Sequence, residues 1–301
     1  MIKIFEKVIM EIIAGQLMDK DLPLSFLKFS TATSGFGLND KVIFLVFKNG
    51  SLEPFLCLKT VRNYGAKHAV LRNFKNLNYL NAVTAGSPYE RLFARAVHLH
   101  DDGENVFSIE TACWGDRIGQ NKDKLSQVIS SYTDFQVHLA GQNNGDVRSI
   151  DEIARETIAK SGLPELEQKE LLEYFLNLPH SNIILPRIIQ HGDLTPDNVL
   201  LSKEGFCVVD YDDVGNTDIP GFDLSCLFRR FDVKNSVALC AEYLPDYFKK
   251  IGGNFNSENY RGLLFLYNFI EYSQKKSHNF EKVLAKEVIS GFERLYPKPS
   301  N

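Results

Sequence analysis

The apolar positions of the first 112 residues predict a helix followed by a β-rich region. Residues 4–17 place apolar side chains three and four positions apart, which is the spacing of an amphipathic helix. Helical spacing returns at 66–80. Alternating and continuous apolar runs predict five strands, at 26–29, 41–47, 55–61, 93–100 and 105–111. Asn49-Gly50 favours a tight hairpin, so a small antiparallel sheet is expected.

The pattern changes near residues 110–115, after which helical spacing dominates. We predict helices at 124–140, 149–160 and 165–178, and three or so more between Leu224 and Tyr296. Between these groups, the runs 199–201 and 206–209 are β-rich and predict a hairpin. The expected fold class is α+β with two lobes, namely a sheet-containing N-terminal lobe of residues 1–112 and a helical C-terminal lobe of residues 113–301. A cleft between two such lobes is where ligand sites tend to lie.

Composition and charge narrow the class of protein. Apolar residues make up 44% of the chain and aromatic residues 12%, which is typical of a globular protein. The net charge is −4 and no Lys/Arg-rich run occurs, so nucleic acid is not an expected partner. No apolar run reaches the roughly 18 residues of a membrane span, and Glu6 and Lys7 interrupt the apolar N-terminus. The five cysteines lack CxxC spacing and fit reduced thiols. A cytoplasmic protein with no membrane partner is expected.

The segment His191-Gly192-Asp193, with Asn198 five residues beyond Asp193 and Asp210 twelve residues beyond Asn198, carries the main candidate chemistry. The predicted hairpin would have Asn198 at one end and Asp210 at the other, close in space. Phosphoryl transfer needs such a set, because one carboxylate orients a hydroxyl while an amide and a second carboxylate hold Mg²⁺ on ATP phosphates. The alternative is an ordinary surface hairpin whose acids cap turns.

Two features of the N-terminal lobe fit a nucleotide. Ser34, Gly35 and Gly37 lie in a turn between predicted strands, where backbone amides and the Ser34 hydroxyl could donate to phosphates; the alternative is a plain turn. Lys59 alternates with Phe55 and Cys57 on one strand face, and a lysine on an inner face needs an anionic partner. The alternative for Lys59 is the solvent face of an edge strand.

These motifs resemble those of the aminoglycoside phosphotransferase and choline kinase family, whose members are small-molecule kinases with a protein-kinase-like fold. The catalytic loop of that family resembles His191-Gly192-Asp193 with Asn198, and its metal-binding segment resembles residues 208–212. The segment 215–224, with Asp223-Leu224 at its end, also matches. The resemblance implies transfer of the ATP γ-phosphoryl, with Mg²⁺, to a hydroxyl of a sugar, an amino alcohol or an aminoglycoside-like molecule.

The resemblance also implies roles for single residues. Asp193 would orient or deprotonate the acceptor hydroxyl, and Asn198 and Asp210 would hold Mg²⁺. Lys59 would contact the α- and β-phosphates, while Gly35 and Gly37 would lie over the triphosphate. The adenine base would have Val42 and Cys57 above it and Leu200 below it, and backbone groups of residues 110–113 would bind its edge. Ordinary core packing is the alternative for Val42, Cys57 and Leu200.

Three positions depart from the family pattern or leave alternatives open. Asp40 occupies a position where a third glycine often stands in protein kinases. Asn73 occupies the helix position where a Glu partner of the phosphate lysine is expected, so that pair is either missing or replaced by a neutral hydrogen bond, with Glu90 as a possible substitute. A nucleotide-binding pseudokinase that acts as a scaffold is therefore the second hypothesis. Asp223 either holds the catalytic loop or caps a helix.

The remaining expectations concern His191 and the acceptor. His191 is expected to be a structural, hydrogen-bonding residue behind Asp193. The acids at 212, 213 and 218 would favour a cationic acceptor if they line its site. A protein kinase is disfavoured, because no Ala-Pro-Glu segment follows Asp210.

Overall fold

A computed structural model gives the fold of this chain, which divides into two compact units, residues 1–115 and residues 116–301. The structure describes residues 5, 7–10, 24–30, 41–48, 50–119, 121–142, 146–179, 183–203, 205–253, 260–278 and 284–296.

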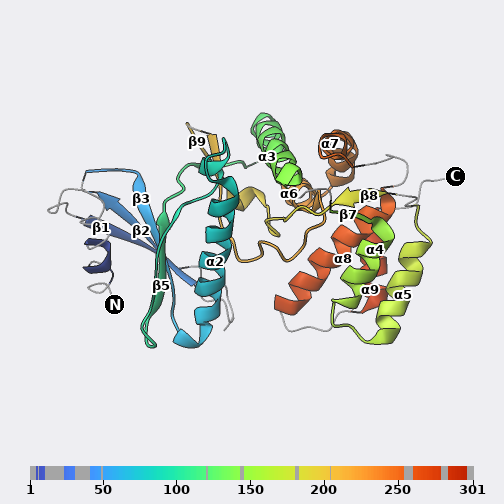
Figure 1. The fold of residues 1–301 in the computed structure, drawn as a ribbon, viewed down its shortest axis with the longest axis horizontal. Helices are drawn as coiled ribbons and strands as arrows, with labels where there is room; N and C mark the ends of the chain where they lie inside the picture. The colour runs from blue at the N-terminus through green and yellow to red at the C-terminus, as the bar shows by residue number, and fades with distance from the viewer. Residues whose placement is uncertain are drawn as a thin grey trace. The chain divides into compact units, whose positions relative to one another are not determined.

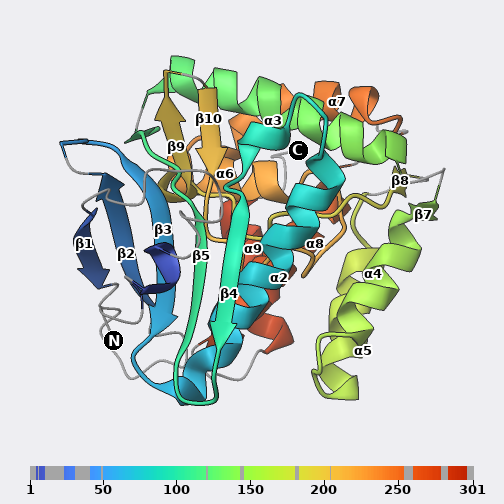
Figure 2. The same ribbon diagram turned by 60° about the vertical axis from the view of Figure 1, so that its left-hand side comes forward.

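The first unit contains a five-stranded antiparallel sheet in the order β1-β2-β3-β5-β4. Figure 2 shows these strands side by side, with the long helix α2 (Lys67–Thr84) running along the sheet. Helix α2 contacts β3, β4 and β5. The strands are β1 (Leu24–Ser30), β2 (Lys41–Lys48), β3 (Pro54–Val61), β4 (Ala96–Asp101) and β5 (Val106–Thr111). Strand β3 is therefore interior to the sheet, with β2 on one side and β5 on the other.

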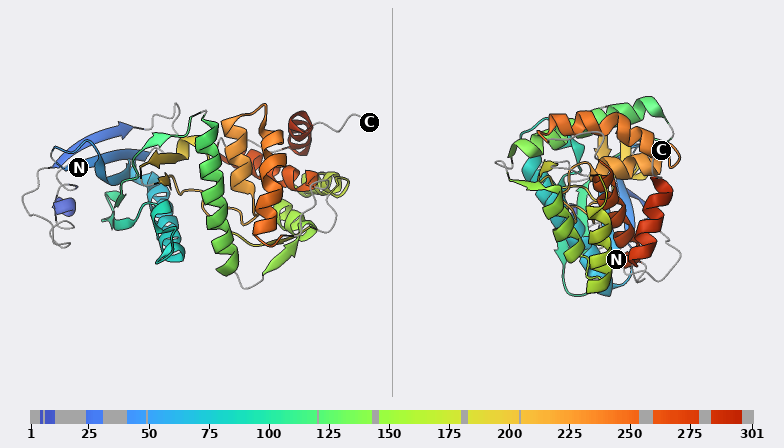
Figure 3. Two further views of the ribbon diagram at one scale, coloured as in Figure 1. Left: turned by 90° about the horizontal axis from the view of Figure 1, so that it is seen from above. Right: turned by 90° about the vertical axis from the view of Figure 1, so that its right-hand side faces the viewer.

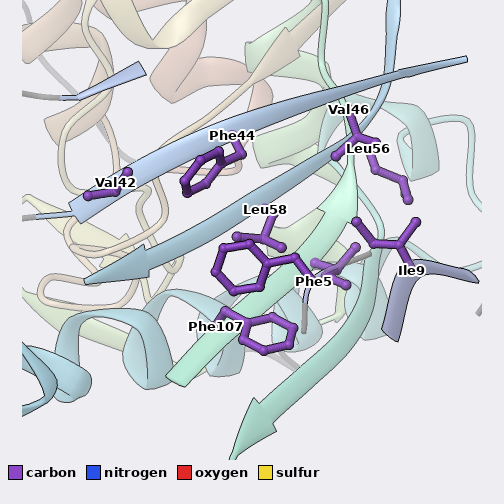
Figure 4. Packing of buried hydrophobic residues seen from close by; sticks show 9 residues of the cluster. Phe5, Ile9, Val42, Phe44, Val46, Leu56, Leu58 and Phe107 are labelled. Carbon is purple, nitrogen blue, oxygen red and sulfur yellow. The ribbon is translucent and has the colours of Figure 1, made fainter. Parts of the chain in front are cut away.

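The two faces of this sheet have different neighbours because side chains alternate along each strand. One face carries a buried apolar cluster, closed by Phe5 and Ile9 from the helical residues near the N-terminus. Figure 4 shows this cluster, whose labelled strand residues are Val42, Phe44, Val46, Leu56, Leu58 and Phe107. The other face includes Val61 and Val106, which pack with Val70 of α2. Residues of the first face occupy alternate positions of β2, as the sequence pattern requires.

The second unit is mainly helical (Figure 1), and its helix α8 is buried from 262 to 270. Helix α8 contacts α4, α5, α6 and α9. Figure 3 gives two further views of these helices. Their bounds are α3 (Lys122–Gln142), α4 (Ile150–Ala159), α5 (Glu165–Leu176), α6 (Phe222–Phe231), α7 (Ser236–Lys250), α8 (Arg261–His278) and α9 (Ala285–Leu295).

Short strands and turns complete the second unit. Strand β9 (Val199–Ser202) pairs with both β10 (Gly205–Val208) and β6 (Asp116–Arg117), and β7 (Val147–Ser149) pairs with β8 (Ile184–Pro186). Helix α4 begins with a capping box in which Ser149 and Glu152 satisfy each other's backbone N–H groups. The 3-10 turns are Tyr64–Ala66 and Glu90–Leu92 in the first unit and Pro196–Asn198 in the second.

The α+β fold class is confirmed, and the described residues after 221 contain four helices where three or so were expected. The expected helix at 4–17 and the Asn49 position lie largely outside the described residues. Cys57, Cys226 and Cys240 are buried free thiols, whereas Cys113 and Cys207 are each disulfide-bonded, so the expectation of reduced cysteines is wrong for these two. Within the described ranges, no helix has both the length and the apolar character needed to cross a membrane.

Candidate active site

The loop from His191 to Asn198 brings a carboxylate and an amide into direct contact. The Asn198 side-chain nitrogen Nδ2 donates to the Asp193 backbone oxygen at 2.9 Å and to its carboxylate Oδ2 at 3.0 Å. A 3-10 turn that starts at Pro196 carries Asn198 back towards Asp193, and Pro is favoured there because its fixed φ suits the first turn. The sequence-predicted residues Asp193 and Asn198 are therefore adjacent.

The Asp223 carboxylate fixes the start of this loop from the first turn of α6. Its Oδ2 accepts from the backbone N–H of His191 at 2.7 Å, and its Oδ1 accepts from the N–H of Gly192 at 2.9 Å. Tyr132 of α3 donates its hydroxyl to the same carboxylate, which is fully buried. The N-cap of α6 is Gly221, with no side-chain cap. The loop-holding interpretation of Asp223 is confirmed, and the helix-cap interpretation is wrong.

Gly192 lets the loop pass against a second acidic segment. Its φ is +89°, a value that L side chains rarely adopt. A Cβ atom at this position would lie 2.3 Å from the Asp213 backbone oxygen, far inside van der Waals contact. The segment after β10 can therefore approach the loop only because residue 192 has no side chain.

Asp210 lies in that second segment and has an unusual backbone. Its φ is 68°, and among the described residues no other residue except glycine has a positive φ. The Val209 N–H donates to the Asn198 carbonyl at 2.9 Å, which joins this segment to the loop. On the other side, Tyr211 is fully buried and its hydroxyl donates to the Val208 carbonyl at 2.7 Å. A left-handed residue held on both sides by hydrogen bonds is typical of functional sites.

The electrostatics of Asp193 reflect this crowding. Burial raises the pKa of the Asp193 carboxyl above its ordinary value, and the negative charges of Asp213 and Asp210 raise it further. The charge of His191 and the hydrogen bond from Asn198 act in the opposite direction. Asp193, Asn198 and Asp210, which the sequence pattern predicted to be close in space, are thus brought together within the second unit.

The ring of His191 packs against Tyr211, whereas its backbone N–H makes a hydrogen bond. The imidazole is buried and meets the Tyr211 ring edge to face, with centroids 6.0 Å apart. Neither ring nitrogen has a hydrogen-bond partner among the described residues, and the backbone N–H is bound by Asp223. His191 is therefore a structural residue, as expected, with its hydrogen bond made by the backbone and its ring in a packing role.

The donor set of this site fits Mg²⁺. Because Asn198 uses its Nδ2 towards Asp193, its Oδ1 is the amide atom left to face a cation. Carboxylate and amide oxygens are the ligands that Mg²⁺ prefers, and it commonly takes one or two from the protein and the rest from water and phosphates. Across the described residues, no group of three or more His, Cys, Asp or Glu side chains forms a complete metal cage. This is compatible with an ion held by Asn198 and Asp210 alone.

Lys59 lies on the interior strand β3 of the other unit, where its ammonium contacts Glu110 and Asn73. Its Nζ lies 2.8 Å from Glu110 Oε1 and donates to Asn73 Oδ1 at 3.2 Å. Lys59 is 5% exposed, so the edge-strand alternative is wrong. Asn73 supplies the neutral hydrogen bond that the sequence suggested, but the acid is Glu110 of β5, which sequence reasoning missed. Glu90, the substitute suggested by the sequence, is exposed in a 3-10 turn.

The strand register separates two residues that were expected to share a ligand surface. Ile43 lies opposite Lys59 and Leu45 lies opposite Cys57, so these four side chains occupy one face. Val42 occupies the other face, in the buried cluster of Figure 4. The structure therefore does not bring Val42 and Cys57 together, and Ile43 and Leu45 are the half-buried apolar residues beside Cys57. Burial raises the pKa of the Cys57 thiol to about 12, so it stays protonated.

Leu200 lies in the middle strand of the three-stranded sheet, half-buried, opposite Cys207 of β10 and Arg117 of β6. The predicted phosphate turn lies outside the described residues; this applies to Ser34, Gly35, Gly37 and Asp40.

The three acids suggested for a cationic acceptor have different surroundings. Asp218 forms ion pairs with Arg148 Nη2 at 2.5 Å and with Arg187 Nη1 at 3.5 Å, so two arginines balance its charge. Asp212 and Asp213 are half-buried in the segment after Asp210. Asp213 belongs to the candidate site, because its negative charge raises the pKa of Asp193.

Comparison with known proteins identifies the class. Residues 111–263, just over half of the 301-residue chain, match the sequence model of the phosphotransferase enzyme family. The chain belongs to this family, which confirms the resemblance in the catalytic-loop and metal-binding motifs. A comparison with curated protein sequences gives no match.

Solved structures share the fold at low sequence identity. A proposed fructosamine-3-kinase from Haemophilus somnus 129PT has a TM-score of 0.54 and 11% identity, with 96% of each chain covered. A thermostable mutant of aminoglycoside phosphotransferase APH(4)-Ia, in complex with ADP and hygromycin B, has a TM-score of 0.52 and 12% identity over 91% of this chain and 95% of that one. A GDP complex of a mutant aminoglycoside 2'-phosphotransferase-IIIa has a TM-score of 0.51 and 13% identity over 95% of both chains. The fold is protein-kinase-like, and family and fold together support a small-molecule phosphotransferase of the kinase type.

Proposed function

We propose that this protein transfers the γ-phosphoryl group of ATP, with Mg²⁺, to a hydroxyl group of a small molecule. The observation that carries the proposal is the grouping of Asp193, Asn198 and Asp210, in which Asn198 bonds both to Asp193 and, through its carbonyl, to the segment of Asp210. A carboxylate beside an amide and a second carboxylate is the set that phosphoryl transfer to a hydroxyl requires.

Asp193 would accept a hydrogen bond from the acceptor hydroxyl and take its proton. The half-buried carboxylate is steadied by the Asn198 amide, and Asp223 holds the backbone before it, so the acceptor would meet a prepositioned base. Its raised pKa makes it a stronger base than an exposed aspartate. Most of the rate would come from positioning and from charge neutralisation.

Asn198 and Asp210 would hold Mg²⁺ through Oδ1 and a carboxylate oxygen. When bound, the ion neutralises charge on the transferring phosphoryl group. The negative charges of Asp210 and Asp213 support a cation here, since the repulsion by which they raise the pKa of Asp193 would be relieved by a nearby positive charge.

The nucleotide would be bound mainly by residues 1–112, with residues 113–301 carrying the catalytic loop and the acceptor site. Lys59 would contact the α- and β-phosphates, and the turn of Ser34, Gly35 and Gly37 would cover the triphosphate. Cys57, with Ile43 or Leu45 in place of Val42, and Leu200 would lie against the base. The ADP and GDP complexes of structurally similar proteins support a nucleotide as donor.

The acceptor would be a sugar, an amino alcohol or an aminoglycoside-like molecule. The support is the family and the similar structures, one complexed with hygromycin B and one named as a fructosamine kinase. Of the acids at 212, 213 and 218, Asp213 would be the one to meet an amine on such an acceptor, because its charge acts on Asp193.

Phosphoryl transfer from radiolabelled ATP to a panel of sugars, amino alcohols and aminoglycosides tests this function. Asp193→Asn should lower kcat by about 10²- to 10⁴-fold, the usual contribution of a general base. The matched control is Asp197→Asn in the same loop, because Asp197 is exposed and pairs with the exposed Arg117. That variant should keep kcat within about twofold of wild type, as expected when a surface ion pair is removed. Equal activity of the Asp193 variant and the wild type would refute the proposal.

The pseudokinase alternative rests on Asn73, which stands where an acidic partner of Lys59 is expected on helix α2. In the structure Glu110 of β5 is the acidic partner of Lys59. The distinctive expectation of this alternative is that Mg·ATP raises the melting temperature although no acceptor on the panel is phosphorylated.

A further inference from the structure

Lys59 has its opposite charge inside the sheet and not on the helix beside it. We infer that Glu110 of β5 is the positioning residue for the Lys59 ammonium, a role that rests on the proposed function of Lys59 as a phosphate ligand. The Lys59–Glu110 contact is 2.8 Å, and both side chains are almost completely buried, at 6% and 4% exposure.

The strand register explains how the two side chains meet. Lys59 lies directly opposite Ser108, and Cys57 lies directly opposite Glu110, across the hydrogen-bonded pair β3 and β5. Lys59 and Glu110 are therefore diagonal neighbours on one face, a spacing that long side chains bridge. Because hydrogen bonds fix the two backbones relative to each other, the carboxylate has a defined position with respect to the ammonium.

Helix α2 contributes a different kind of contact. Asn73 is fully buried and accepts a hydrogen bond from Lys59 at 3.2 Å, but an amide carries no charge. The ammonium is thus oriented from two directions, while the balancing charge comes from the sheet. A shift of α2 would remove a hydrogen bond and leave the ion pair intact.

Glu110 also supplies the counter-charge that a buried ammonium needs. An ammonium in a site this closed to water is costly unless it is paired with an anionic group. Glu110 therefore balances the charge of the Lys59 side chain as well as fixing its direction.

The test uses the full chain and measures kcat and the KM for ATP. Glu110→Gln keeps the shape and removes the charge, so kcat should fall about 10- to 100-fold, as expected when a phosphate ligand is misplaced by about 1 Å. The KM for ATP should change less than about threefold, because other contacts hold the nucleotide. The control is Glu104→Gln, which makes the same chemical change at an exposed position between β4 and β5 and should leave both constants as in wild type.

A second variant moves the carboxylate to the helix. Glu110→Gln with Asn73→Glu restores one acid beside Lys59, and kcat should recover to within about fivefold of wild type, which a purely structural role of Glu110 does not predict. A folded double variant that is no more active than Glu110→Gln alone would overturn the inference, as would a Glu110→Gln variant within twofold of wild type. If the double variant does not fold, Glu110→Asp replaces it. A kcat of Glu110→Asp about ten times that of Glu110→Gln supports the inference, and equal kcat values for these two variants overturn it.

Failure of the proposed function gives a different result. In that case the wild type shows no more transfer or ATP hydrolysis than Asp193→Asn does. The inference about Glu110 is then decided by the rise in melting temperature with Mg·ATP. At the same Mg·ATP concentration, a smaller rise in Glu110→Gln than in wild type supports it, and an equal rise overturns it.

Discussion

In the first unit the buried ammonium of Lys59 lies against a carboxylate. In the second unit the carboxylate of Asp193 is half-buried near two other acids, Asp210 and Asp213, and the opposing effects of His191 and Asn198 leave its pKa raised. The first arrangement is electrostatically balanced by the protein alone. The second is incomplete, since the acids at 210 and 213 both raise the pKa of Asp193. The difference indicates that Glu110 balances the charge of Lys59, which would meet phosphates. A bound cation would balance the charge of Asp193, which would meet the acceptor.

This comparison predicts that removing a charge has opposite effects in the two places. In the Lys59–Glu110 pair, loss of one member leaves the other buried without its counter-charge. At Asp193, loss of the charge removes repulsion. Stability measurements on matched variants separate these cases.

The largest effect is expected from breaking the Lys59–Glu110 pair. Lys59→Met should lower the free energy of unfolding by about 3–5 kcal/mol, because Glu110 is left buried without a counter-charge. The double variant Lys59→Met with Glu110→Gln removes both charges and should recover most of this loss. Thermal or urea unfolding of the four proteins measures the coupling. A double variant as unstable as the single one would show that packing, not charge balance, determines the effect.

An intermediate effect is expected at Asp223. Asp223→Ala leaves the backbone N–H groups of His191 and Gly192 buried and unsatisfied, which should cost about 2–4 kcal/mol. Tyr132→Phe removes only the third hydrogen bond and should cost about 1 kcal/mol. Unfolding curves give both values. Equal losses in the two variants would mean that Asp223 acts through Tyr132 and not through the loop.

The smallest effect is a stabilisation. Because the folded-state pKa of Asp193 is raised, the native protein binds this proton more tightly than the unfolded chain does. Stability is therefore lost as the pH rises from the ordinary aspartate pKa of about 4 through the raised folded value. Asp193→Asn cannot ionise, so at pH 8 its melting temperature should exceed that of wild type by about 2 °C.

That difference should vanish at a pH below both pKa values, and Mg²⁺ should reduce it at pH 8. Scanning calorimetry across pH measures it. A variant less stable than wild type at pH 8 would show that the Asn198 hydrogen bond outweighs the repulsion.

The geometry of the Asp193 loop could be predicted from sequence because it is local. Asp193 and Asn198 are five residues apart on one loop, with Pro196 starting the turn between them. Asp210 follows a hairpin whose strands are recognisable from Val199 and Val208, so its approach to Asn198 also follows from a short-range pattern.

Glu110 could not be predicted in the same way because its role depends on which strand pairs with β3. The sheet order places β5, not β4, beside β3, and sequence patterns do not determine that choice. The separation of Val42 from Cys57 has a similar cause, since a shift of one residue in register exchanges the faces of a strand. The alternation of Ser108 and Glu110 within an apolar run was the available signal.

At Gly192 nothing separates the backbone of the Asp193 loop from the backbone of the acidic segment that contains Asp213. Electrostatic repulsion grows as distance shrinks, so the absence of one methyl group there sets how strongly residues 193 and 213 oppose each other. The affinity for the cation that we propose to bind here would then depend on this close approach of the backbone as well as on the side chains that hold the ion.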